Sequence, residues 1–309
     1  MADDPGIAVV GSYNHDMSVT VPSLPVLGET VSGADFQEHA GGKGSNQAIA
    51  AARSGGDVAF VGAVGDDRFG EAARELWVEE GVDAADVRMV DATTGVALIH
   101  VTESGENAIA VATGANDELD AEAVRSAGAI AGCDVVLTQL ETPLDSVTEA
   151  VSRGKSVGAE VVFDPAPHRA LPEGFLQDVS VVTPNEGEVR LLAGHDPDAD
   201  IDEEAAARAV LARGPDVVVV TLGADGALVV TDDGVEAVDP IPVDVVDTTG
   251  AGDAFNGAFA VARGNGLGIV AATERGIAAG ALACTERGVV PSLPAGSAID
   301  ELLERKREG

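Results

Sequence analysis

The sequence predicts a three-layer α/β fold, with a mostly parallel central sheet covered by helices on both faces and a small β-sheet lid. From residue 115 onward, valine-rich runs at residues 134–139, 160–163, 179–183 and 217–222 alternate with helical segments. Near-continuous valines of this kind are typical of strands buried on both faces of a parallel sheet. α/β folds often reach this length around one core, so we expect residues 1–309 to form a single domain.

The amino-terminal part predicts two further buried strands. Residues 7–11 form a short apolar run ending at a glycine, and residues 58–64 form another. Residues 69–80 have the periodicity of an amphipathic helix, which Gly81 ends. We expect these elements to extend the same sheet.

A glycine-rich run precedes a short predicted helix. Residues 40–47 read AGGKGSNQ and lead into a helix at residues 48–53. This is not a Walker A loop, because Gly-Lys-Ser/Thr does not occur in it. Three glycines around Lys43 would allow a polar ligand to approach closely, and a glycine-rich helix start without a ligand is the alternative.

The lid is predicted from about residues 13–40 and 94–114. The first segment is β-like and is interrupted by Pro22, Pro25 and Gly28, while residues 95–101 and 107–112 have the pattern of a hairpin. We expect these strands to pair outside the main core.

Polar residues follow the predicted strands at their carboxyl ends, the edge at which open α/β sheets bind ligands. Asn14 and Asp16 are two apart in an extended segment, so they point the same way and could hold two sugar hydroxyls. An Asx turn that ends the strand is the alternative. Other strands end at Gln139 with Glu141, Asp164, Asn185 with Glu188, and Thr221 with Gly223. Each of these side chains could instead cap a helix.

The sequence DTTGAGDAFNG at residues 247–257 combines a glycine turn, two acids and the start of a helix. At residues 243–246 valines alternate with acids, which predicts a short strand. Residues 255–262 predict the helix. The turn would present unpaired N–H groups at a helix N-terminus, where glycine lets an anion such as phosphate approach. Asp253 is then either a first-turn residue that complements the helix dipole or a general base that deprotonates an alcohol.

The charge balance excludes several classes of partner. The 53 acidic against 18 basic residues give a net charge of −35, which is unsuited to nucleic acid or an anionic membrane. No apolar run approaches the ~18 residues of a membrane span, so we expect a cytoplasmic protein. A dispersed acidic excess indicates folding in concentrated salt, where the distance over which charges act on one another falls to ~3 Å at 1 M. We therefore expect an extreme halophile as the source.

Together these motifs resemble the ribokinase/PfkB family of sugar kinases, over nearly the whole chain. The resemblance is carried by GS to Asp at residues 11–16, GGKG to NQ at 41–47, QLE at 139–141, DPAP at 164–167, TPNE at 183–186, TLG at 221–223 and DTTGAGD at 247–253. Two such motifs in the right order are a specific signal, whereas one would not be.

The resemblance implies transfer of the ATP γ-phosphoryl group to a sugar hydroxyl, with O5 of D-ribose as the first choice of acceptor. It implies Asp253 as the catalytic base, with Gly250, Ala251 and Gly252 forming the anion hole. The implied sugar-binding residues are Asn14, Asp16, Gly42, Lys43, Asn46, Glu141 and Asp253. Those implied for ATP are Asn185, Glu188, Thr221, Gly223, Gly226 and Gly252.

The resemblance also implies two metal ions and an assembly. Glu188 would organise Mg²⁺ with the phosphates, and the lid would form a homodimer contact. An activating K⁺ would be held, in several cases through backbone oxygens, by Asp247, Thr249, Ala283, Glu286, Gly288 and Ser292. Ile277 departs from the family pattern, which commonly has a polar residue near the adenine, so that contact is not carried over.

Other functions remain open at this stage. The acceptor could be another pentose such as deoxyribose, or fructose, 2-keto-3-deoxygluconate or a nucleoside, although Asn14 and the GGKGSN run favour ribose. A non-catalytic sugar-binding regulator would be expected to lose Asp253 or the glycine turn, and both are present. A dinucleotide-dependent oxidoreductase is disfavoured because no G-x-G-x-x-G follows the first strand.

Overall fold

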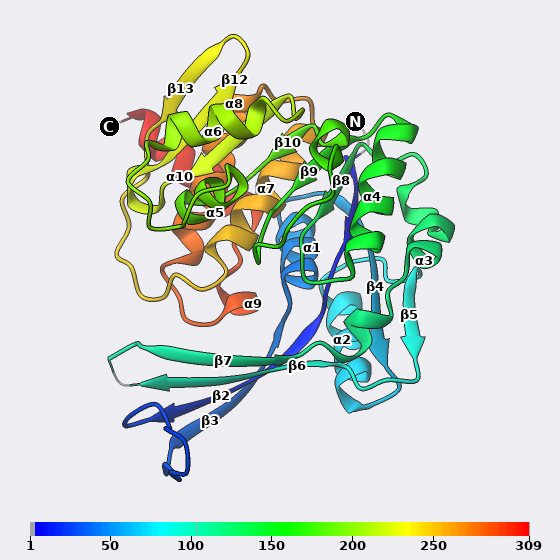
Figure 1. Cartoon of the computed structure of the whole chain (residues 1–309), viewed down its shortest axis with the longest axis vertical. Helices are drawn as coiled ribbons and strands as arrows, with labels where there is room; N and C mark the ends of the chain where they lie inside the picture. Colours follow the sequence, from blue (N-terminus) through cyan, green and yellow to red (C-terminus); the bar gives the residue numbers. More distant parts are fainter. Residues whose placement is uncertain (1–3, 103, 309) are drawn as a thin grey trace.

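Nine strands form the central sheet of the computed structural model, which describes residues 4–102 and 104–308 (Figure 1). Their order is β13-β12-β11-β10-β9-β8-β1-β4-β5. Neighbours are parallel from β11 to β5, whereas β12 and β13 are antiparallel to the strands beside them. The bounds are β1 (Gly6–Val10), β4 (Asp57–Gly65), β5 (Val87–Val90), β8 (Val135–Thr138), β9 (Glu160–Phe163), β10 (Val181–Val182), β11 (Val217–Thr221), β12 (Ala227–Thr231) and β13 (Gly234–Val238).

Helices cover both faces of this sheet, as the sequence predicts. Alternate residues of β1 show the two sides: Ile7 and Val9 pack with helices α1, α2, α7, α8 and α10, while Ala8 and Val10 pack with α3 and α4. Helices α5 and α6 lie over β10 and β11 on the side of α4. The bounds are α1 (Lys43–Arg53), α2 (Arg68–Glu79), α3 (Ala121–Ser126), α4 (Leu144–Val157), α5 (Glu186–Leu192), α6 (Glu203–Leu211), α7 (Ala251–Gly264), α8 (Ile269–Ala283), α9 (Val289–Ser292) and α10 (Gly296–Glu308).

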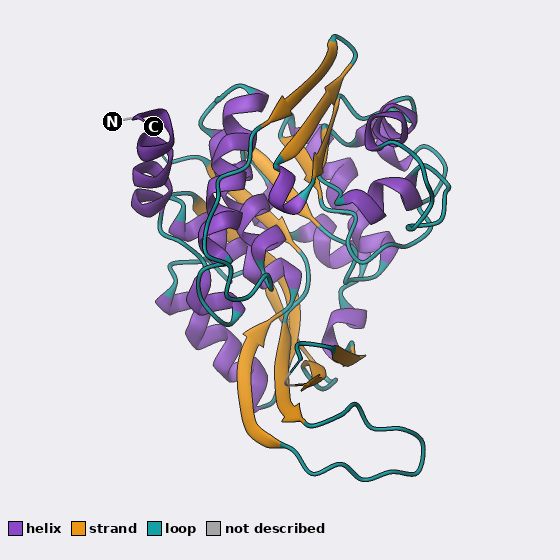
Figure 2. Ribbon diagram, turned by 90° about the vertical axis from the view of Figure 1, so that its left-hand side faces the viewer, coloured by secondary structure: helices purple, strands orange, loops and turns teal. Residues whose placement is uncertain are grey.

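A separate four-stranded sheet has the order β3-β2-β6-β7 and projects from the body of the molecule (Figures 1 and 2). It consists of β2 (Asn14–Val21), β3 (Ala34–Gly41), β6 (Gly95–Thr102) and β7 (Asn107–Ala112). Strands β2 and β6 are parallel, and the two outer pairs are antiparallel. At the inner end of this sheet, Asn14 pairs with Gly41 and Gly95. Asn14 follows β1 after a short connection, and Gly41 lies just before the start of α1. We call this sheet the lid.

Several expected boundaries are wrong. Residues 243–246 are a loop and not a strand, with Val245 and Val246 exposed. No strand of residues 4–102 and 104–308 pairs with them, and the amide of Val246 instead donates to the Cys284 carbonyl at 2.8 Å. The glycine-rich run is itself helical from Lys43, and the strand expected at residues 179–183 shortens to two residues. The β12–β13 hairpin was not predicted at all.

Membrane insertion can be examined for the helices of the described segments. None of them combines the length and the apolar character that a bilayer crossing requires.

Candidate active site

The glycine turn before α7 has the geometry of an anion site. Gly250 caps the helix with φ of 82°, a left-handed conformation that glycine adopts without strain, and a Cβ there would lie 2.6 Å from Val289 Cγ1. Within the described part of the chain, no hydrogen bond uses the amides of Gly252 and Asp253. The first turn of α7 therefore presents unpaired N–H groups, where a helix dipole favours negative charge.

Asp253 lies in this first turn and is only 6% exposed. Its Oδ2 accepts a hydrogen bond from Asn46 Nδ2 at 2.9 Å, and its Oδ1 accepts one from Gln47 Nε2 at 3.1 Å. Both donors belong to α1. Burial raises the pKa of Asp253 to about 6, although the Lys43 ammonium and the two amides act in the opposite direction. A carboxylate whose pKa is this close to neutrality suits a general base.

Helices α1 and α7 meet closely enough for these bonds because small residues line their contact. A Cβ on Gly257 would lie 2.5 Å from the Cβ of Ala50. Fixing the two backbones at this separation brings side chains about two hundred positions apart in sequence into one cluster.

The side chains implied for the sugar gather around Asp253. Glu141 Oε2 accepts from Ser12 Oγ at 2.5 Å and from the Lys43 amide at 2.9 Å, at the start of α1. Burial, with Glu141 and Asp253 nearby, raises the pKa of Asp16 to about 7. Burial alone would lower the pKa of Lys43, but the carboxylates of Asp164, Asp253 and Glu141 raise it. These charges are therefore close enough to act on one another.

Asn14 and Asp16 both lie in β2, so the Asx-turn alternative is wrong. Asn14 is 5% exposed, and its Oδ1 accepts from Asn116 Nδ2 at 2.9 Å. Asn116 also exchanges hydrogen bonds with the backbone of Tyr13, at 3.0 and 2.9 Å. Asn116 thus orients the Asn14 amide so that its Nδ2 remains to donate. Sequence reasoning missed Asn116, for which only its position just after the predicted hairpin was a clue.

Three other buried polar residues belong to the cluster and were not assigned to the site from the sequence. Gln47 lies on α1 and contacts Asp253, while Gln139 and Asp164 follow β8 and β9. Gln139 and Asp164 were noticed as polar strand ends, but nothing local indicated that they meet. Gly42, with φ of 87°, brings α1 to the backbone of Tyr13 and Asn14, where a Cβ would lie 2.6 Å from the Asn14 amide nitrogen.

On the other side of the glycine turn lies a mostly apolar cavity of about 490 Å³. Thr221, Gly223 and Gly226 line it from the region after β11, and Ala251 and Gly252 line it from the turn. Its remaining walls include Ile241, Val243, Val245, Phe255, Ile277 and Ala281. An apolar cavity with a few polar groups at one end fits a planar base whose phosphates reach the turn.

Asn185 and Glu188 form a capping box at the start of α5. Glu188 Oε2 accepts from the Asn185 amide, and Asn185 Oδ1 accepts from the Glu188 amide, both at 2.9 Å. The helix-cap alternative is therefore confirmed for this pair. The backbone of Asn185 also forms an isolated parallel β-bridge with that of Thr221. The charge of Glu188 raises the pKa of both Lys43 and Asp164. The pair consequently lies between the cavity and the Asp253 cluster.

Asp247 connects the loop before the turn to the region after α8. Its Oδ1 accepts from the amide and hydroxyl of Thr249 at 3.0 and 2.7 Å, and its Oδ2 accepts from the Gly288 amide at 3.3 Å. Burial would raise the pKa of Asp247, but the bonds from Thr249 and Gly288 lower it. Ser292 Oγ is occupied with the Val289 carbonyl at 2.8 Å, and Glu286 is exposed.

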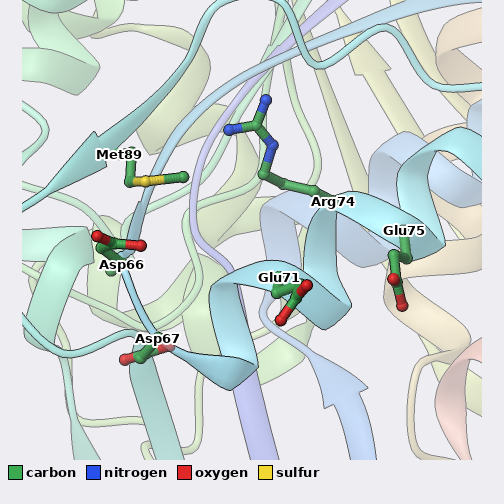
Figure 3. Close-up of a pocket in the computed structure, with 7 residues that line it drawn as sticks. Asp66, Asp67, Glu71, Arg74, Glu75 and Met89 are labelled. Atoms are coloured by element: carbon green, nitrogen blue, oxygen red, sulfur yellow. The ribbon is translucent and has the colours of Figure 1, made fainter.

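A second hollow, of about 560 Å³, lies at the end of β4 beside α2 (Figure 3). Figure 3 shows Glu71, Arg74 and Glu75 on α2, with Met89 on the neighbouring strand. Asp67, which also lines it, caps α2 by accepting from the amides of residues 69 and 70. None of the residues implied for sugar, ATP or cation lines this hollow.

Comparisons with known proteins show the family of the chain. The chain matches the pfkB family carbohydrate kinase pattern over residues 4–296. It is 40% identical to the ribokinase of Haemophilus influenzae over 261 residues, which cover 83% of this chain and 84% of that protein. It is 37% identical to the deoxyribokinase of Salmonella typhi over 257 residues, which cover 82% and 84%.

A solved structure, that of Arabidopsis thaliana ribokinase complexed with ribose and ATP, superposes with a TM-score of 0.88 at 32% identity. The alignment covers 97% of this chain and 99% of that one. The resemblance inferred from the motifs is confirmed: the chain belongs to the pfkB family of carbohydrate kinases.

Proposed function

We propose that the protein phosphorylates D-ribose at O5 with ATP, giving D-ribose 5-phosphate and ADP. The observation that carries this proposal is the glycine turn, which separates the buried Asp253 cluster from the apolar cavity. Relatives and a structural neighbour that are ribokinases support ribose as the acceptor.

Asp253 is the proposed base of the reaction. O5 attacks the γ-phosphorus while its proton passes to the Asp253 carboxylate, the bond to the β–γ bridging oxygen breaks, and ADP leaves. The amides of Gly250, Gly252 and Asp253 receive the charge that develops on the phosphoryl oxygens, whereas the Ala251 amide, also expected there, donates to the Thr248 carbonyl at 3.3 Å. The sugar is held by Asn14, Asp16, Gly42, Lys43, Asn46 and Glu141. Of these, Asn46 donates a hydrogen bond to that carboxylate, and Asp16 and Lys43 interact with its charge.

ATP occupies the cavity in this proposal. Its base contacts the apolar walls that include Ile277, and its phosphates run past Thr221, Gly223, Gly226 and Gly252 towards Asn185 and Glu188. With an isoleucine in the wall, shape rather than hydrogen bonding would select the base.

Two metal ions fit the residues that are present. Mg²⁺ would be bound mainly by the ATP phosphates, beside the single carboxylate of Glu188, because Mg²⁺ commonly takes one or two carboxylates together with substrate phosphates. Mg²⁺ neutralises phosphate charge when bound. For K⁺, the ionised Asp247 and the backbone carbonyls near residues 249 and 283–288 are suitable oxygen ligands.

The setting of the enzyme is also proposed. Exposed apolar side chains on the lid, at Phe36, Leu98, Ile109 and Val111, support a homodimer formed through that sheet. The need for ATP supports action in the cytoplasm. The net charge of −35 supports a cytoplasm with a high salt concentration, as in a halophile.

An acceptor panel tests the function. ADP release would be measured with ATP and Mg²⁺ in molar KCl, using ribose, 2-deoxyribose, fructose, 2-keto-3-deoxygluconate and adenosine in turn. We expect the highest kcat/KM with ribose, and Asp253→Asn supplies the background. A preference for 2-deoxyribose would transfer the assignment to the activity named for the Salmonella relative, and no ADP with any acceptor would support a sugar-binding regulator.

A further inference from the structure

One buried amide joins two buried carboxylates in this molecule. Gln47 Nε2 donates to Asp164 Oδ2 at 2.8 Å and to Asp253 Oδ1 at 3.1 Å. Gln47 is 0% exposed, Asp164 4% and Asp253 6%. Both hydrogens of a single NH₂ group are therefore used on acceptors that water cannot replace.

The orientation of the Gln47 amide follows from the chemistry of its neighbours. An ionised carboxylate only accepts hydrogen bonds, so Gln47 must turn its NH₂ group to the two acids and its oxygen away. Gln139 Nε2 donates to that oxygen at 2.5 Å. A Cβ on Gly11 would lie 2.2 Å from Gln139 Oε1, so the glycine leaves room for Gln139. The bridge is thus supported from β1 and β8.

The same bridge brings like charges together. The charge of Asp164 raises the pKa of Asp253, while Lys43 and the bonds from Asn46 and Gln47 lower it; burial is the largest influence and raises it. Burial likewise raises the pKa of Asp164 to about 6, although the charge of Lys43 acts to lower it. Asp16, on the lid strand β2, also interacts with Asp253, whose charge helps to raise the pKa of Asp16.

We propose that Gln47 is a positioning residue that aims the Asp253 carboxylate and holds the Asp164 carboxylate beside it, so that the charge of Asp164 acts on Asp253. The inference rests on the proposed function, in which Asp253 accepts the proton of the sugar hydroxyl. Gln47 holds Oδ1, Asn46 holds Oδ2, and the carboxylate cannot rotate away from the attacking oxygen. Asp164 keeps Asp253 basic enough to take a proton near neutral pH.

Two variants should move the acid limb of the pH profile in opposite directions. Gln47→Met removes both N–H groups at similar volume, so the pKa of Asp253 rises and the acid limb of kcat/KM moves to higher pH. Because the base is no longer aimed, kcat falls on the order of 10²-fold with a smaller change in KM for ribose. Asp164→Asn removes the charge, and its one oxygen can keep the 2.8 Å bond from Gln47 in place of the 3.2 Å bond from the Ala166 amide, so the acid limb moves to lower pH.

A matched control separates these effects from the loss of an amide as such. Gln177→Met makes the same replacement at an exposed position outside the site and should leave the wild-type profile unchanged. Thermal unfolding in the same salt shows that each variant is folded. If Gln47→Met does not fold, Gln139→Met serves in its place. It removes the hydrogen bond that the Gln47 oxygen accepts and should move the acid limb of kcat/KM to higher pH by a smaller amount.

A second readout does not need turnover. The Asp253 carboxyl would be titrated by ¹³C NMR without substrates and identified by its absence in Asp253→Asn. Opposite shifts of its pKa in Gln47→Met and Asp164→Asn support the inference, whereas shifts in one direction, or none, overturn it. Lack of ribose phosphorylation by the wild type would overturn the proposed function and leave this titration as the test of the bridge.

Discussion

At the level of single residues, Asp253 is the group whose charge state matters most. It is buried with two amide donors, and its pKa of about 6 leaves it ionised at neutral pH. Asp253→Asn keeps the shape but cannot accept a proton, so turnover should fall by roughly 10²–10⁴-fold while the affinity for ribose changes far less. Initial rates and ribose binding by calorimetry measure the two effects. Near-normal turnover would remove Asp253 from the mechanism.

Asn14 should control discrimination between ribose and 2-deoxyribose. Its oxygen is held by Asn116, which leaves its NH₂ group to bind a sugar hydroxyl. A missing hydroxyl leaves a buried polar group unpaired, at a cost of about 1–3 kcal/mol, so the wild type should clearly prefer ribose. Asn14→Met should narrow the ratio of the two kcat/KM values.

The control for this prediction is Asn265→Met, at an exposed position that follows α7. It should keep the full preference for ribose. Equal use of both sugars by the unmutated protein would contradict the role given to Asn14.

At the level of secondary structure, two glycines of one turn should respond differently to alanine. Gly250 has a positive φ and no space for a Cβ, so Gly250→Ala should destabilise the fold by roughly 1–2 kcal/mol or more. Gly252 is helical and a Cβ there meets nothing within 4 Å, so Gly252→Ala should fold at least as well as the wild type. Its methyl group would instead occupy the position of the phosphate and lower kcat/KM.

Thermal unfolding and ATP kinetics distinguish the two substitutions. Gly250→Ala should lower both the unfolding temperature and the rate, and Gly252→Ala only the rate. If Gly252→Ala were fully active, no anion would approach that amide closely, and the proposed phosphate site would lie elsewhere.

At the level of the whole molecule, salt should act in two separable ways. With a net charge of −35, the acidic side chains repel one another, and any salt screens this repulsion. The unfolding temperature should therefore rise equally with NaCl and with KCl. A K⁺ held near Asp247 would stabilise the loop before the anion site, so the initial rate should be higher in KCl than in NaCl at matched ionic strength.

Asp247→Asn provides the comparison for the ion effect. It removes the charge that a cation would neutralise, so the preference for KCl should disappear while the gain in stability with salt remains. Identical rate curves for the two cations in the wild type would falsify the specific cation site and leave the screening argument intact.

The sequence by itself determined the layered α/β architecture, because a strand buried on both faces needs consecutive apolar residues and the chain shows such runs locally at residues 161–163 and 217–220. It also determined the glycine turn, because only glycine adopts the φ of 82° at position 250 without strain. Family membership followed from these motifs and their order, which was confirmed.

Only the tertiary structure decided which polar side chains meet. Gln47 and Asp253 are 206 positions apart, Asn14 and Asn116 are 102 apart, and neither pair has a local signal because each depends on how α1, α7 and the lid pack. Packing also decided that residues 243–246 remain a loop, since a strand needs a partner strand and none in the described part of the chain pairs with them. Local sequence specifies what a backbone segment can adopt, whereas a site made of side chains depends on the distances between segments that packing alone sets.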